Sequence, residues 1–113
     1  MIHLTAETHI FLATQPADFR QGIDGLARIC QARLSSDPRS GSLFVFINRS
    51  KTMIRTLSYD GTGFWLMTKR LSKGKFQGWP SSNEAINPIL AKHLRHLLTG
   101  DRRDPLWQKI SEP

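Results

Sequence analysis

The chain has 113 residues, of which 39% are hydrophobic and 22% are charged, and its formal net charge at pH 7 is +7. This length allows one domain with one modest core, and this composition is typical of a globular protein rather than a disordered one. The positive charge favours nucleic acid, an anionic membrane surface or an acidic protein as a partner. The alternative is that the charge only keeps the protein soluble.

The only cysteine is Cys30, so the chain forms no internal disulfide, which fits a reducing cytoplasm. Its helix-like surroundings predict an apolar packing role rather than a nucleophile. The first residues do not have the pattern of a signal peptide, and no segment is apolar over the length of a membrane span. We therefore expect a cytoplasmic protein that has no membrane partner.

The first third of the chain predicts a strand and then a helix. Residues 9–14 are apolar and β-leaning, Pro16 ends this run, and Asp18 is placed to cap the next element. Apolar side chains then recur at steps of three and four from Ile23 to Leu34, which indicates an amphipathic helix near residues 20–34.

The middle of the chain reads as hairpins. The continuous apolar run LFVFI at 43–47 predicts a central strand that is covered on both faces. Residues 53–59 and 64–69 predict two further strands, and the sequence DGTG between them is a strong hairpin signal. After the turn SKGK at 72–75, residues 76–79 predict a short edge strand.

The last third predicts a helix near residues 88–98, with Pro88 in its first turn, Asn87 as its cap and Gly100 at its end. Residues 101–113 are mostly polar and are expected to form a flexible tail after a single domain of residues 1–100. The predicted fold is therefore α+β, with an antiparallel sheet of four or five strands built from hairpins and flanked by two main helices.

Two blocks of residues resemble a known family. The first block is Leu12-Ala13, Pro16, Asp18-Phe19-Arg20, Gly22 and Asp24-Gly25-Leu26. The second block comprises Asp37-Pro38, Ser40-Gly41, Leu43-Phe44-Val45-Phe46, Asn48-Arg49, Asp60, Gly63-Phe64, Lys69-Arg70-Leu71, Gly74, Phe76 and Trp79-Pro80. Together they resemble the TnpB accessory proteins, encoded by the second open reading frame of bacterial insertion sequence sixty-six elements.

This resemblance implies a helper role in DNA transposition, with the strand-transfer chemistry in a separate, cognate transposase. The chain departs from the family pattern at Ser58, where a tryptophan is expected, and at Ser72, where an acid is expected. One residue is added at Gln77-Gly78 relative to the family pattern, and the tail matches no part of it. These departures put an aromatic role at position 58 in doubt, but not the family.

Cations gather at two predicted turns of the sheet. If the hairpins run as predicted, both turns share one end of the sheet, where lysine and arginine gain affinity for DNA by releasing counterions from phosphates. The alternative is a solvated cationic rim. The candidate nucleic-acid-binding residues are Arg49, Lys51, Lys69, Arg70, Lys73 and Lys75.

A second candidate site lies at the start of the first helix. Asp18, Arg20 and Asp24 could form a partner or metal site, but a cap and an Asp–Arg bridge that fix the loop are the favoured interpretation. Among the aromatic residues, Trp65 is assigned to packing with its phenylalanine neighbours. Trp79 is the best candidate for exposure, although packing is the favoured interpretation for it as well.

No catalytic constellation, metal site or cofactor motif is expected. Asp18, Asp24 and Asp60 are the acids from which a two-metal nuclease centre could be built, and His93 with His96 is a weak zinc signal. We therefore expect a non-catalytic accessory protein that binds DNA, transposase or both. A pure protein-interaction module and a small metal-dependent nuclease remain the alternatives, and the sequence leaves the oligomeric state open.

Overall fold

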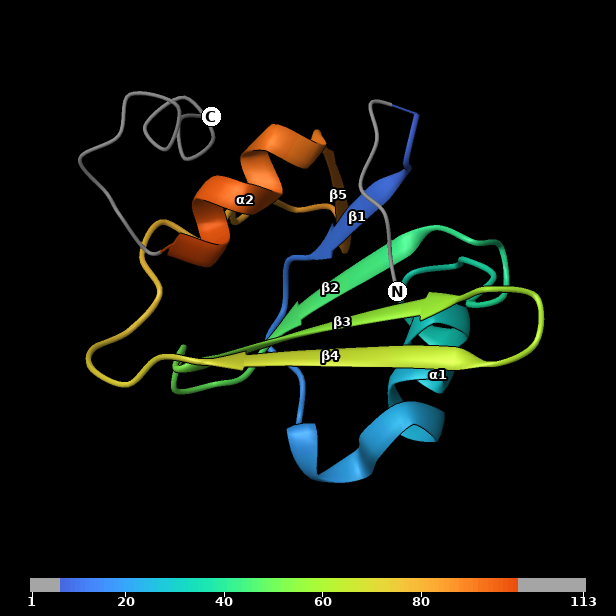
Figure 1. Ribbon diagram of the computed structural model, residues 1–113, viewed down its shortest axis with the longest axis horizontal. Helices are drawn as coiled ribbons and strands as arrows, with labels where there is room; N and C mark the ends of the chain where they lie inside the picture. The colour runs from blue at the N-terminus through green and yellow to red at the C-terminus, as the bar shows by residue number, and fades with distance from the viewer. Residues whose placement is uncertain (1–6, 100–113) are drawn as a thin grey trace.

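A computed structural model describes residues 7–99, and its centre is a five-stranded sheet in the order β4-β3-β2-β1-β5 (Figure 1). A short 3-10 turn (Phe19–Gln21) precedes the first helix. The strands are β1 (Ile10–Ala13), β2 (Leu43–Ile47), β3 (Met53–Tyr59), β4 (Phe64–Arg70) and β5 (Ile86–Ile89), and the helices are α1 (Gly22–Ala32) and α2 (Ala91–Thr99). These elements confirm the predicted α+β class with two main helices.

The sheet is mixed rather than antiparallel throughout. β1 runs parallel to β2, with Ile10 opposite Leu43, whereas the pairs β1–β5, β2–β3 and β3–β4 are antiparallel. The prediction of a purely antiparallel sheet was therefore wrong. The physical reason is that α1 connects β1 to β2 and returns the chain to the end from which β1 started, as parallel strands require.

Strand β2 separates two apolar layers and is buried at all of its positions, as predicted. Its side chains alternate between the faces of the sheet. Phe44 and Phe46 pack with Leu26 and Cys30 of α1. On the other face, Leu43, Val45 and Ile47 pack with Leu94 and Leu97 of α2. The two helices thus cover opposite faces of the sheet.

The loop before α1 is built by Asp18. Its side chain accepts a hydrogen bond from the backbone N–H of Arg20, which caps the 3-10 turn. Gly22 then takes a positive φ of 69°, a conformation that favours glycine, and α1 begins there. Cys30 is fully buried in α1, and this burial raises the pKa of its thiol to about 12, in agreement with the packing role that was predicted.

The predicted helix at 88–98 is wrong in its first turn. Asn87 and Pro88 belong to β5, where they lie opposite Leu12 and Phe11 of β1. An edge strand tolerates proline because the missing N–H need not face a neighbouring strand. The helix begins only at Ala91, so Asn87 is not its cap.

The predicted edge strand at 76–79 was also wrong, because this segment forms no strand. Phe76 is instead buried in the core between the sheet and α2. The long connection between β4 and β5 therefore contributes an anchor to the core. The predicted tail at 101–113 lies outside the described residues.

No helix within residues 7–99 is both long enough and apolar enough to cross a membrane.

Candidate nucleic-acid interface

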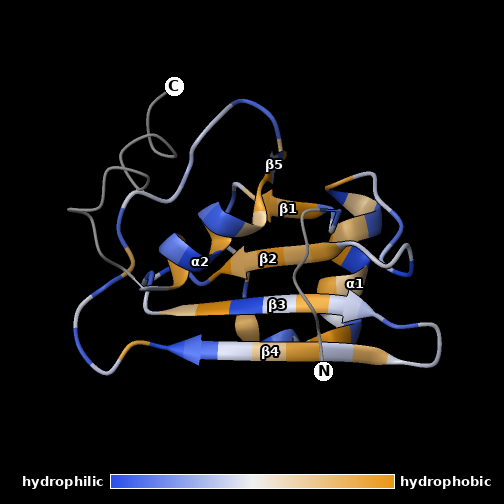
Figure 2. Ribbon diagram, turned by 45° about the horizontal axis from the view of Figure 1, so that its top comes forward, coloured by the Kyte–Doolittle hydropathy of each residue, from blue (hydrophilic) through white to orange (hydrophobic). Residues whose placement is uncertain are grey.

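Two basic turns lie side by side at one end of the sheet, as the sequence predicted. The β2–β3 turn and the connection after β4 meet at this end, which is the hydrophilic left side of β4 in Figure 2. The backbone N–H of Leu71 donates to the carbonyl of Thr52 at 3.0 Å, and that of Phe76 donates to the carbonyl of Lys51 at 2.7 Å. These two hydrogen bonds hold the 72–75 turn against the β2–β3 turn.

Asn48 builds the β2–β3 turn. Its side-chain oxygen accepts from the backbone N–H groups of Thr52 and Met53 at 3.0 and 3.1 Å. Lys51 within this turn has a positive φ of 62°, which is uncommon for a residue other than glycine. The hydrogen bonds to Asn48 thus hold the turn in a conformation that places a non-glycine residue at positive φ.

All six predicted cations are exposed at this end, and none forms an ion pair with a residue of the described range 7–99. Lys69 and Arg70 are neighbours on β4, so their side chains project to opposite faces of the sheet. The charges therefore surround the end of the sheet instead of forming one flat patch. We call this set the basic end: Arg49, Lys51, Lys69, Arg70, Lys73 and Lys75.

The loop that carries Asp18 and Arg20 extends the basic end. The backbone N–H of Ala17 donates to the carbonyl of Ile47 at 2.9 Å, which places this loop beside the end of β2. Arg20 donates from Nη2 and Nε to the Asp18 carboxylate, with a shortest distance of 2.8 Å. This pairing holds the pKa of Asp18 at about 2, so the carboxylate stays charged.

The Asp18–Arg20 pair lines an open cavity of about 500 Å³ together with Asn48, Arg49 and Arg55. The Arg20 side chain is 91% exposed, so its guanidinium can reach a ligand even while it is paired. The geometry is that of the predicted loop-fixing bridge, and it adds one further cation beside the basic end.

Arg55 is a cation at this end that sequence reasoning did not assign. Its guanidinium donates to the carbonyl of Phe19 and to Oγ1 of Thr68, and it lies 4.9 Å from the centre of the Phe19 ring. Arg55 thereby ties β3 to β4 and to the Asp18 loop. No local pattern signals this role, because Phe19 and Arg55 are far apart in the sequence.

Two other predicted site residues do not belong to the basic end. Asp24, in the first turn of α1, lines a separate groove with Arg28 and Arg39. Trp79 is half-buried, and its indole N–H donates to the carbonyl of Ala13 at 3.0 Å. Trp79 was the best candidate for exposure among these aromatic residues, but packing was favoured for it too, and its side chain indeed anchors the β4–β5 connection to β1.

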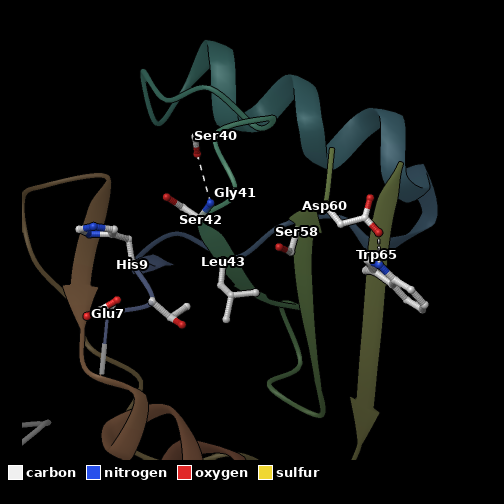
Figure 3. A pocket seen from close by; sticks show the side chains of 10 residues that line it. Glu7, His9, Ser40, Gly41, Ser42, Leu43, Ser58, Asp60 and Trp65 are labelled. Atoms are coloured by element: carbon white, nitrogen blue, oxygen red, sulfur yellow. Dashed lines mark hydrogen bonds between the residues drawn. The ribbon is translucent and has the colours of Figure 1, made fainter. Parts of the chain in front are cut away.

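Within residues 7–99 the exposed tryptophan is Trp65, at the opposite end of the sheet, so its assignment to packing was wrong. It is 44% exposed and lines a cavity of about 340 Å³ with Ser58 and Asp60 (Figure 3). Asp60 accepts hydrogen bonds from the backbone N–H groups of Thr62 and Gly63 and from the Trp65 indole. These bonds lower the pKa of Asp60 and give it the turn-forming role that its sequence context predicts.

The acids considered for a nuclease centre are not brought together. Asp18 lies in the loop beside the basic end, Asp60 lies at the other end of β3, and Asp24 lies on α1. Among residues 7–99, no group of three or more His, Cys, Asp or Glu side chains is placed to hold a metal ion. His93 and His96 both lie on α2, in the described part of the chain, without a third such ligand.

The fold and the basic end define a small α+β domain whose distinguishing surface is a cluster of exposed cations. The chain belongs to the family of IS66 Orf2-like proteins, whose model matches residues 8–107. This membership confirms the resemblance seen in the two sequence blocks and supports an accessory role in transposition.

Two relatives come from Sinorhizobium fredii, strain NBRC 101917 / NGR234. The uncharacterized protein y4hO is 39% identical over 97 residues, which cover 85% of this chain and 84% of the relative. The uncharacterized protein y4jC is 38% identical over 87 residues, which cover 77% of this chain and 74% of the relative. No solved structure matches the chain.

Proposed function

We propose that this protein is a non-catalytic accessory factor in the transposition of an IS66-type insertion sequence, and that its basic end binds DNA phosphates. The proposal rests chiefly on one observation: two hydrogen bonds join the two basic turns, so that six exposed cations occupy one end of the molecule. Family membership supports a role in transposition. The positive charge of the basic end supports DNA phosphates as its ligand.

The cations are suited to phosphate more than to bases. They lie on turns and at the end of one strand, and the basic end includes neither helix. Contacts from such side chains position a protein on DNA but read little sequence. Binding is therefore expected to be weakly sequence-specific, to decrease steeply with salt and to take place in the cytoplasm.

The test is a set of gel-shift titrations with duplex and single-stranded DNA over a range of salt concentrations. The test variant combines Lys51→Asn, Lys73→Gln and Lys75→Gln, and asparagine is chosen at position 51 because it tolerates the positive φ. If each cation contacts one phosphate, the slope of log affinity against log salt for duplex DNA becomes shallower by about 3.

A control variant that combines Arg28→Gln, Arg33→Gln and Lys92→Gln removes the same charge from the two helices and the α1 C-terminus. Its salt slope should stay close to that of the unmodified protein. Equal losses in both variants would show that net charge, not the basic end, attracts DNA. Absence of any shift at low salt would exclude direct DNA binding.

The same cations could instead receive an acidic surface of the cognate transposase, with no DNA contact. Pull-down with the transposase, with and without nuclease treatment, separates these partners. Capture that survives nuclease and is lost in the Lys51, Lys73 and Lys75 variant, together with no gel shift, would favour the protein-interaction module. Cleavage of DNA with Mg²⁺ or Mn²⁺ that Asp60→Ala abolishes would overturn the non-catalytic role.

A further inference from the structure

The outer edge of β4 is exposed and unpaired within residues 7–99. β4 forms one border of the sheet and is seven residues long, and its side chains are mostly exposed. The other border, β5, is four residues long and contains Pro88, and both features make it a poor edge for pairing with another strand. Within the described part of the chain, the sheet therefore has one protected edge and one edge that is open to another strand.

The hydrogen bonds of β4 fix which of its backbone groups point outward. Asp60 N–H donates to the carbonyl of Gly63, and Leu71 N–H donates to the carbonyl of Thr52. In an antiparallel ladder these contacts alternate, so odd-numbered β4 residues bond to β3. The even-numbered residues direct their N–H and C=O groups away from the sheet: Phe64, Leu66, Thr68 and Arg70.

We propose that β4 pairs antiparallel with β4 of a second copy of this chain, about a two-fold axis at Met67. Outward-pointing groups must face one another, so even-numbered residues pair with even-numbered residues, and Met67 lies opposite Met67 of the second copy. This register uses the full length of β4. It is isologous, because each residue of one copy meets the same partner in the other.

Side-chain chemistry favours this register over its neighbours. Trp65 and Met67 are 44% and 45% exposed, and they share a face of β4 with Lys69. The register sets Lys69 of each copy opposite Trp65 of the other, where a cation can lie on the indole face. It also sets Arg70 opposite Phe64. Shifting the pairing by two residues would remove these matches.

The charges at the two ends of β4 are also complementary. Asp60 lies next to Trp65, and its carboxylate accepts from the Trp65 indole at 2.8 Å, which holds the ring in place. Pairing brings Lys69 of the second copy towards this acidic turn. The two basic ends then lie at opposite extremes of the pair, so their mutual repulsion is small.

Sedimentation velocity over a range of concentrations tests the pairing with Thr68→Pro. Proline removes an outward N–H from each copy and leaves the β3 ladder intact, so dimerisation should weaken about thirtyfold or more. Thr68→Val is the matched control, because it also loses the hydroxyl that receives Arg55 but keeps the N–H. A species of twice the 12.9 kDa chain mass should persist in Thr68→Val.

Cysteine substitution tests the register without proline, so the test stands even if Thr68→Pro does not fold. Met67→Cys should form a disulfide between copies under mild oxidation, since opposite residues of a non-hydrogen-bonded pair approach to about 4.5 Å. Leu66→Cys and Thr68→Cys should not, since each lies two positions from its own counterpart. A monomer at every concentration, a dimer that is indifferent to Thr68→Pro, or cross-linking only at 66 or 68 would overturn the proposal.

Discussion

Strands β2 and β4 belong to one sheet and are separated only by β3, yet their surroundings are opposite. Every residue of β2 is buried between the two helices, whereas β4 is mostly exposed and lies at the border of the sheet. Both strands begin with apolar residues, LF in β2 and FWL in β4. The apolar first half of β4 therefore does not by itself predict burial, since Trp65 and Met67 are 44% and 45% exposed.

The difference teaches where stability and recognition reside in this small domain. β2 supplies side chains to both apolar layers, so its residues hold the sheet and helices together. β4 presents an open edge and ends in two of the cations of the basic end. Substitutions in β2 should therefore act on folding, and substitutions in β4 should act on association.

The largest expected effect tests this division directly. Phe46→Ala removes a fully buried ring between β2 and α1 and should lower the free energy of unfolding by about 3–5 kcal/mol. Met67→Ala on β4, measured at low protein concentration, should cost less than about 1 kcal/mol. Urea unfolding followed by circular dichroism gives both values, and similar losses in the two variants would contradict the division.

A smaller effect concerns the connection that follows β4. Trp79→Phe keeps an aromatic ring but removes the hydrogen bond from the indole to the carbonyl of Ala13. We expect a loss of about 1 kcal/mol in unfolding free energy. Ser81→Ala, at an exposed position of the same connection, is the control and should be nearly neutral. A neutral Trp79→Phe would show that the bond does not anchor this segment.

The buried thiol gives a pH-dependent test. The folded-state pKa of Cys30 is about 12, above the ordinary 9.0, because burial disfavours the thiolate. Its contribution to stability is therefore complete below the ordinary value and falls as pH rises from 9.0 towards about 12. Unfolding free energies across this interval should fall less steeply in Cys30→Ala than in the unmodified protein. Equal slopes would contradict the burial effect.

The smallest effect concerns the exposed pair at the basic end. The Asp18 carboxyl should titrate at about 2 by NMR, below its ordinary 3.8, because Arg20 donates to the ionised form. The pairing is present above the ordinary value and is lost as pH falls through about 2. Arg20→Gln should move the midpoint upward, and Arg33→Gln should leave it in place. An unchanged midpoint in Arg20→Gln would mean that Arg20 is not its partner.

Local patterns predicted the elements that depend on neighbouring residues. The apolar run of β2, the periodicity of α1 and the Asp60–Gly61 hairpin signal all gave the observed structure. The meeting of the two basic turns also followed from hairpin geometry, because β3 and β4 return the chain to the end where β2 stops.

The errors arose where distant residues decide the structure. Pro88 is acceptable at the start of a helix, but pairing with Phe11 places it in a strand. Trp65 was expected to pack but is exposed, because β4 lies at the border of the sheet, whereas Trp79, the best candidate for exposure, is held by a hydrogen bond to β1. Arg55 was missed for the same reason, since Phe19 reaches it only in the folded chain.

The hydrogen bonds from Leu71 and Phe76 to the β2–β3 turn have a thermodynamic consequence for ligand capture. They order the cation-bearing segments before any ligand arrives, whereas a disordered basic arm loses conformational freedom as it binds. Association at this end should accordingly show a small heat-capacity change and little gain in secondary structure.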